Sequence, residues 1–186
     1  MAEEKLAIAI IAAAGFAETT FTDTQKTLLA QGRKVKVISP DGGLVQGWHD
    51  GAWGHHFMAD EDIAESLAAD YAGLILPDGK NSADTLIENV HTKRLISAFM
   101  DAEQPVLVVG DALRLLVPAG VVAARRIAGA AEVDEEVSRA GAELVADQNL
   151  VTDGNLITAT SDSNSGARLE AFLGLIVESE AVPKAA

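Results

Sequence analysis

The residues of this chain that could do chemistry lie in three short segments, each of which follows an apolar run typical of a buried strand. The segments are residues 14–18, 77–79 and 110–111. Ligands in open α/β sheets bind beyond the carboxyl ends of the strands, so the three segments should converge on one pocket. The pocket would then hold the carboxyl groups of Glu18, Asp78 and Asp111. Gly79 and Gly110 would add backbone groups but no side chain, so the site would lack a nucleophile.

The third segment has the pattern of a nucleophile elbow without the nucleophile. The β-branched apolar run 105–109 stops at Gly110, and a helical pattern begins at once at Asp111. A strand that turns so sharply into a helix lifts one residue above the edge of the sheet and leaves free backbone N–H groups beside it. In an enzyme of this design that residue would be Ser or Cys. Here it is glycine.

Asp111 is open to two interpretations. As an acid in the first turn of a helix it would simply complement the helix dipole, and we favour this structural interpretation. The functional alternative is a general acid or base, or a ligand contact, that works together with Glu18. Two carboxylates held close together would raise the pKa of one of them.

Histidine and tryptophan gather between residues 48 and 56. His55 and His56 are adjacent, and on a strand their side chains would point to opposite faces, so they could not easily ligate one ion. A metal site that also used His49 is conceivable, but solvated or interface histidines are the commoner case, and we predict no metal. Trp48 and Trp53 flank glycine-rich turns and are predicted to serve packing or a subunit contact.

Composition limits the possible partners. The 186 residues suit one domain, with 48% hydrophobic but only 4% aromatic residues, and 28 acidic against 14 basic side chains give a net charge of −14. Such a surface repels nucleic acid and anionic membranes. The absence of cysteine excludes disulfides and thiolate catalysis. No Gly-x-Gly-x-x-Gly fingerprint follows the first strand, so no nucleotide cofactor is expected. With no signal-peptide pattern and no apolar run long enough to span a bilayer, we expect a cytoplasmic protein.

Strand and helix patterns alternate along the chain. Strands are expected at 6–12, 34–39, 70–76 and 106–109, with shorter ones at 44–46, 56–59, 142–146, 150–152 and 156–160 and a loop at 48–54. Helices are expected from 19 or 20 to 31, at 82–89 and 90–102, after the elbow, and at 134–140 and 169–178. This alternation predicts a single α/β domain, residues 1–186, with a mostly parallel sheet and a frayed tail at 179–186.

Taken in order, these motifs resemble the DJ-1/PfpI superfamily, and most closely its PfpI/YhbO-like intracellular protease branch. The matching pieces are Ala14-Gly-Phe-Ala-Glu18, Val45-Gln-Gly-Trp-His49, Asp70-Tyr-Ala-Gly-Leu-Ile-Leu-Pro-Asp-Gly79, the elbow with Leu115-Leu116 and Ala119-Gly-Val121, and Val151-Thr-Asp-Gly-Asn-Leu-Ile-Thr158. The resemblance extends from Lys5 to about Glu178. It implies a flavodoxin-like α/β/α sandwich of the class I glutamine amidotransferase-like type.

The resemblance also identifies which catalytic groups are missing. Members of this branch carry a Glu after the Gly-Phe pair, a Cys at the elbow and usually a His next to it. These positions are Ala17, Gly110 and Asp111 in this sequence. The Gly-Gly that normally follows Leu-Pro is replaced by Asp78 and Gly79, which brings a charge into the pocket turn.

Two hypotheses of function follow. The first is a catalytically degenerate member, a pseudoenzyme with no catalytic residue and no cofactor that binds a small ligand or acts as a dimeric scaffold. The second is a hydrolase- or lyase-type enzyme, protease-, glyoxalase- or deglycase-like, with Asp111 and Glu18 as acid and base. Because Glu18 lies one residue beyond the family position, its side chain should point elsewhere, and we prefer the first hypothesis. The resemblance further implies a homodimer or larger assembly, with the region around Trp48 and His56 as a candidate contact surface.

Overall fold

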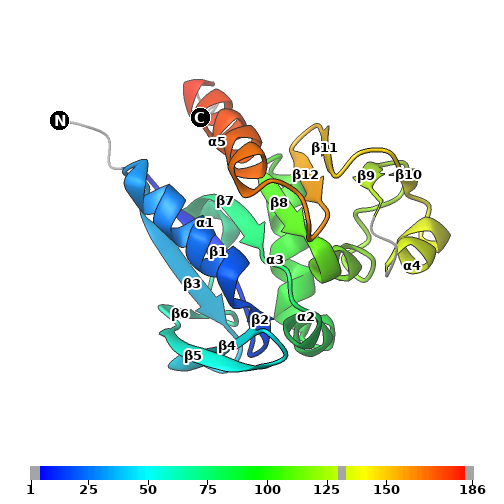
Figure 1. Ribbon diagram of the computed structural model, residues 1–186. Coiled ribbons are helices and arrows are strands. Elements are labelled where there is room, and N and C mark those ends of the chain that lie inside the picture. Colours follow the sequence, from blue (N-terminus) through cyan, green and yellow to red (C-terminus); the bar gives the residue numbers. More distant parts are fainter. Residues whose placement is uncertain (1–4, 130–132, 183–186) are drawn as a thin grey trace.

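A seven-stranded sheet forms the centre of the computed structural model, which describes residues 5–129 and 133–182 (Figure 1). Its strand order is β11-β12-β8-β7-β1-β3-β6. The strands are β1 (Ala7–Ile11), β3 (Val35–Ser39), β6 (Glu61–Asp62), β7 (Tyr71–Leu76), β8 (Val106–Val109), β11 (Leu150–Asp153) and β12 (Leu156–Ala159). Neighbouring strands are parallel except for β11 and β12, which form an antiparallel pair at one edge. The predicted mostly parallel sheet is therefore confirmed.

Helices cover both faces of this sheet. One face carries α1 (Glu18–Ala30) and α5 (Ser165–Ala181), and the other carries α2 (Lys80–Ile87), α3 (Val90–Asp101) and the 3₁₀ segment η2 (Gly110–Leu116). Further elements are η1 (Ala68–Asp70), α4 (Asp134–Arg139), the paired strands β9 (Arg126–Ala128) and β10 (Glu143–Val145), and a three-stranded sheet of β2 (Phe16–Ala17), β4 (Leu44–His49) and β5 (Ala52–Met58). None of the helices in the described part of the chain has the length and apolar character needed to cross a membrane.

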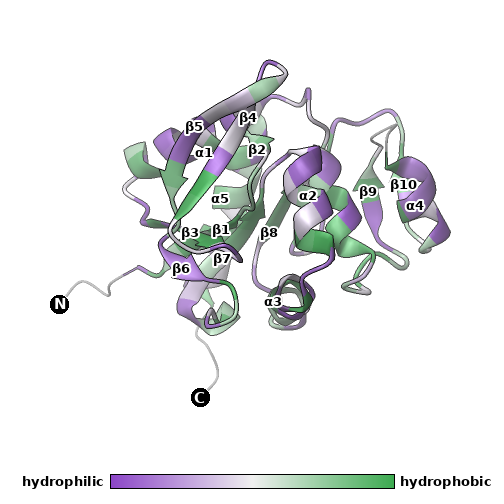
Figure 2. Cartoon of the chain, turned by 90° about the horizontal axis from the view of Figure 1, so that it is seen from below, coloured by the Kyte–Doolittle hydropathy of each residue, from purple (hydrophilic) through white to green (hydrophobic). Residues whose placement is uncertain are grey.

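The central strands are apolar on both sides because each side faces a helical layer. Along β1, Ile8 and Ile10 pack with α1 and α5, whereas Ala9 and Ile11 pack with α3 and η2. All four side chains are fully buried. Figure 2 shows these strands as a hydrophobic centre, with the outlying helix α4 largely hydrophilic. The carboxyl ends of the parallel strands are thereby held at one rigid edge.

No sequence pattern predicted η1, β2, β6 or β9, and three predicted segments differ clearly from what was expected. The predicted loop at 48–54 is a hairpin in which β4 and β5 pair as far as His49 and Ala52, because Asp50 and Gly51 take the positive φ angles, +48° and +80°, of a tight hairpin turn. The segment after the elbow is a 3₁₀ helix. Helix α5 begins earlier than predicted because the Asn164 side chain accepts the N–H of Ala167 at 2.9 Å.

The end of α5 and the start of α1 also differ from their predicted positions. Residues 179–181, which were expected in a frayed tail, form the last turn of α5. Residues 183–186 of that tail lie outside the described residues. At the other end of the chain, α1 begins at Glu18, one or two residues before the predicted start.

Candidate functional site

Gly110 lies at a tight bend between β8 and η2, where the sequence predicts the elbow. The residue is buried and its φ angle is +56°. Glycine adopts this conformation without strain, whereas a residue with a Cβ does so at a cost. The elbow has therefore kept its backbone shape without a side chain.

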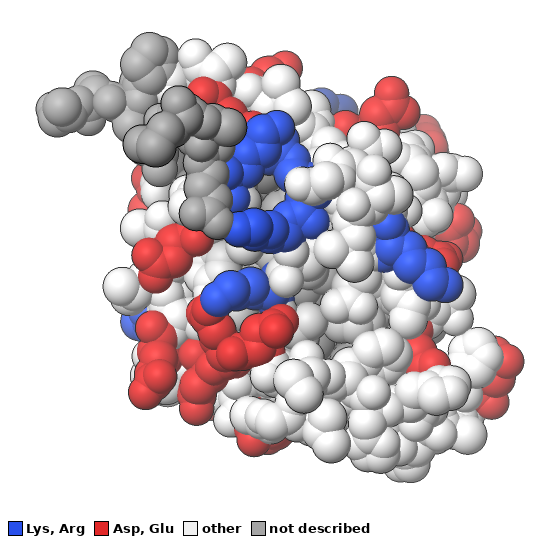
Figure 3. Space-filling view, turned by 90° about the vertical axis from the view of Figure 1, so that its left-hand side faces the viewer, with Lys and Arg blue, Asp and Glu red and all other residues white. Residues whose placement is uncertain are grey.

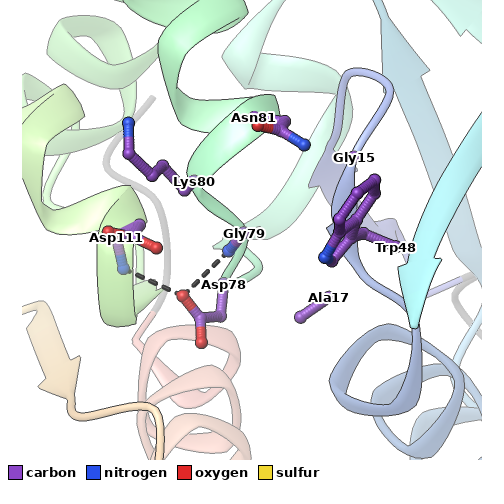
Figure 4. Close-up of a pocket in the computed structure, with 8 residues that line it drawn as sticks. All are labelled: Gly15, Ala17, Trp48, Asp78, Gly79, Lys80, Asn81 and Asp111. Carbon is purple, nitrogen blue, oxygen red and sulfur yellow. Dashed lines mark hydrogen bonds between the residues drawn. The ribbon is translucent and has the colours of Figure 1, made fainter. Parts of the chain in front are cut away.

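The space above Gly110 is occupied by the carboxylate of Asp78. Its Oδ1 atom accepts hydrogen bonds from the N–H groups of Gly79 at 2.8 Å and Asp111 at 2.9 Å (Figure 4). A Cβ atom on Gly110 would lie 2.1 Å from this oxygen and 2.5 Å from Oγ of Ser161, far inside van der Waals contact. Asp78 thus fills the place of an elbow side chain and uses the backbone donors beside it.

A pocket of about 420 Å³ opens next to this carboxylate. It is lined by Gly15, Ala17, Trp48, Asp78, Gly79, Lys80, Asn81 and Asp111 (Figure 4). The ends of β1, β7 and β8 therefore converge as the topology predicts. The ammonium group of Lys80 is engaged by Asp84 at 2.9 Å. The aspartate side chains consequently dominate the charge of the lining.

Backbone contacts hold the three strand ends together. The N–H of Ala17 donates to the carbonyl of Asp78 at 2.7 Å. A Cβ on Gly79, whose φ is +136°, would lie 2.6 Å from Cα of Phe16 and 2.7 Å from the carbonyl oxygen of Gly15. Only glycine allows the two chain segments to approach so closely. This contact fixes Gly79 beside Gly15 and Ala17, three of the residues that line the pocket.

Glu18 is not among the residues that line the pocket. Its nearly buried carboxylate points into the β4–β5 hairpin, where Oε1 lies 2.6 Å from Nδ1 of His55 and Oε2 accepts the His55 N–H at 2.8 Å. Space for it exists because Gly47 and Gly54 lack side chains, and a Cβ on Gly54 would lie 1.8 Å from Oε2. The structure therefore does not bring Glu18 to Asp111, the arrangement that the acid/base hypothesis needs.

Acidification should weaken the contact between Glu18 and His55 and so lower the free energy of unfolding. The hydrogen bond from His55 holds the pKa of the Glu18 carboxyl below its ordinary value. A carboxyl group with a lowered pKa in the folded state stabilises the protein above its unfolded pKa, and this contribution is lost as pH falls through the folded value. We expect the urea midpoints of the wild type and Glu18→Gln to approach each other between about pH 6 and about pH 3. The exposed Glu170→Gln serves as control, and a constant gap for Glu18→Gln would contradict the prediction.

The other histidines are dispersed. His49 contacts Oγ1 of Thr19 through Nδ1 at 3.3 Å and Oδ2 of Asp50 through Nε2 at 3.1 Å. Among residues 5–129 and 133–182, no group of three or more His, Asp or Glu side chains is placed to hold a metal ion. Trp48 and Trp53 pack edge to face at 5.2 Å and 87°, which agrees with a packing role. Trp48 additionally lines the pocket, a position that sequence reasoning did not assign to it.

Two further residues near the elbow escaped the sequence analysis. Ser161 approaches the elbow from the loop after β12, and Arg168 is buried on α5 with 3% of its surface exposed. Both lie more than fifty residues from Gly110 in sequence, and no local motif marks them. The signal in the sequence is that Arg168 is the one basic residue among 165–181, next to the apolar positions of that segment.

The model of the DJ-1/PfpI family matches residues 6–177. DJ-1 protein homolog E of Arabidopsis thaliana is 29% identical over 168 residues, which cover 82% of this chain and 42% of that protein. The chain thus spans about two fifths of the length of this relative. A protein of Thermococcus kodakarensis named as a deglycase is 23% identical and aligns over 91% of this chain and 98% of its own length.

A likeness to solved structures supports the fold. A two-domain protein of Anabaena variabilis, with DJ-1/ThiJ/PfpI-like and ferritin-like domains, superimposes with a TM-score of 0.86 at 23% identity. The match covers 97% of this chain and 50% of that one. At this identity the likeness establishes the architecture, an α/β sandwich, and nothing of the chemistry.

Proposed function

The chain belongs to the DJ-1/PfpI family, and we propose that it is a non-catalytic member, a pseudoenzyme whose pocket binds a small molecule. The observation that carries this proposal is the position of the Asp78 carboxylate. It lies where an elbow side chain would stand and accepts both neighbouring N–H groups.

The chemistry of an elbow enzyme needs a nucleophile, a group that activates it and N–H donors that stabilise an oxyanion. In this chain Gly110 has no side chain, and Ala17 presents a methyl group to the pocket. The N–H groups of Gly79 and Asp111 are already engaged by a full negative charge. While Asp78 holds this position, neither N–H group is open to a developing oxyanion. The pocket itself stays large enough for a ligand.

The alternative is an enzyme with altered chemistry, in which Asp111 acts as acid or base. Two observations support such an enzyme: Asp111 lines the pocket, and a relative is named as a deglycase. Glu18, the partner in that hypothesis, is engaged by His55 instead. Asp111 would therefore have to work without the second carboxylate.

We also propose that the β4–β5 hairpin is a contact surface of a homodimer. The hairpin carries one charged residue, Asp50, and exposes the side chains of Trp53 and Met58. On the face shown in Figure 3, charged groups cover the upper and left-hand parts, and a broad area without Lys, Arg, Asp or Glu lies toward the bottom, the end at which Figure 1 places the hairpin. Exposed apolar groups on an otherwise acidic protein favour burial against another surface.

Turnover assays test the proposed function. The purified protein should not convert a 2-oxoaldehyde, a glycated amino acid or a casein-type peptide faster than buffer, because no thiol or hydroxyl side chain is among the described residues that line the pocket. The same assays on Asp111→Asn and on the exposed Asp147→Asn should give the same background. A turnover that Asp111→Asn abolishes and Asp147→Asn leaves intact would overturn the proposal in favour of the enzyme.

A further inference from the structure

Arg168 is a buried cation without a counter-ion. The residue is 3% exposed, and its Nη1 donates to the carbonyl and the hydroxyl oxygen of Ser163, each at 3.2 Å. Its Nε finds no hydrogen-bond partner, and no ion pair joins the guanidinium to a carboxylate of the described residues. Arginine remains charged in proteins, and an uncompensated buried charge is unfavourable. The site is therefore built to receive negative charge.

Asp78 is the carboxylate whose charge acts most strongly on Arg168, ahead of Asp23. Burial nevertheless dominates and lowers the pKa of Arg168, so neither aspartate compensates the guanidinium fully. Asp78 is committed elsewhere, since Oδ1 accepts the N–H groups of Gly79 and Asp111. Figure 4 shows its second oxygen turned away from those donors, and that oxygen accepts no hydrogen bond from the described residues. The Asp78 carboxylate thus lies near two groups that attract an anion, namely the pair of N–H groups and the Arg168 guanidinium.

We propose that the N–H groups of Gly79 and Asp111 form a binding site for the carboxylate group of a small molecule, which Asp78 fills in the free protein. A ligand carboxylate takes these two N–H groups and displaces Asp78 toward Arg168. The displaced aspartate then becomes the counter-ion that Arg168 lacks. This ion pair offsets the two hydrogen bonds that Asp78 loses when it leaves the N–H groups. This inference rests on the proposed ligand-binding function and names the chemical class of the ligand. Trp48 and Asn81 would enclose the remainder of the molecule.

Titration with sodium acetate, at an ionic strength held constant with sodium chloride, tests the proposal on the full chain. The amide NMR signals of Gly79 and Asp111 should shift with acetate in the wild type. Asp78→Gly, which removes the competing carboxylate, should bind acetate about 10-fold more tightly. If that variant does not fold, Asp78→Asn keeps the size of the side chain, and its neutral amide should compete less well than the carboxylate.

Arg168→Met tests whether Arg168 acts as the counter-ion of the displaced Asp78 or only fills space. The substitution keeps an unbranched apolar side chain and removes the positive charge. It should weaken acetate binding about 10-fold when Asp78 is present and much less in the Asp78→Gly background, where no displaced carboxylate needs a partner. An equal loss in both backgrounds would refute the pairing. Unchanged Gly79 and Asp111 signals in both the wild type and Asp78→Gly, or shifts produced by ethylammonium chloride instead of acetate, would overturn the carboxylate site. Such a result leaves the proposed function standing, since that is decided by turnover.

Discussion

Gly110→Cys, the substitution that would restore a thiol at the elbow, should by itself destabilise the protein by about 2–4 kcal/mol. The new Cβ would lie 2.1 Å from Oδ1 and 2.4 Å from Cγ of Asp78, so the carboxylate has to leave the N–H groups of Gly79 and Asp111. The φ angle of +56° adds backbone strain. Urea denaturation measures the loss. Gly120→Cys is the matched control because its φ is +71° and no atom lies within 4 Å of the added Cβ, so it should cost only about 1 kcal/mol.

The double variant Asp78→Gly/Gly110→Cys should recover much of that stability, because the obstructing carboxylate is gone. The two substitutions would then be strongly non-additive, as expected for groups that compete for one space. Since the natural chain has no cysteine, a chromogenic disulfide reports on position 110 alone. We expect the thiol to react in the double variant faster than in the single one. Additive stabilities and equal reactivities would show that Asp78 does not occupy the elbow space.

The arrangement of strand ends was predictable because it follows from local patterns and one topological rule. Apolar runs that stop at Ala14, Pro77 and Gly110 are readable one by one, and a parallel sheet brings their ends to the same edge. The Asp50-Gly51 pair could also have shown the hairpin, since it is a strong turn signal between two strand-like runs. These features depend on a few consecutive residues.

Its position in the chain indicated that Glu18 would point away from the family's acid position, and it does. The partners of Glu18 and Asp78 depend on contacts between distant segments and were beyond sequence reasoning. Glu18 turns to His55 because glycines at positions 47 and 54 leave a hollow, which only the folded hairpin reveals. Asp78 reaches the elbow because the end of β7 lies beside the end of β8. The sequence shows that a charge has entered the turn at position 78. It does not show that this charge takes over the N–H groups beside position 110.

Gly79→Ala should destabilise the protein by about 3–5 kcal/mol, because two costs combine at this residue. A φ of +136° is open to glycine and strongly unfavourable for alanine. The added Cβ would also meet backbone atoms, namely Cα of Phe16 at 2.6 Å and the carbonyl oxygen of Gly15 at 2.7 Å. Backbone cannot yield as a flexible side chain does, so the strand ends must separate, and the N–H of Ala17 would lose its 2.7 Å bond to the Asp78 carbonyl.

The control for this prediction is Gly43→Ala. Gly43 also has a positive φ, +65°, but no atom lies within 4 Å of an added Cβ, so the substitution should cost about 1 kcal/mol. Urea midpoints give both values, and the tryptophan fluorescence, to which the pocket residue Trp48 contributes with Trp53, should change only in Gly79→Ala. If Gly79→Ala were no more costly than Gly43→Ala, the segments that follow β1 and β7 would not approach each other closely at Gly79. The pocket would then lose the wall on which both the ligand site and the engagement of Asp78 depend.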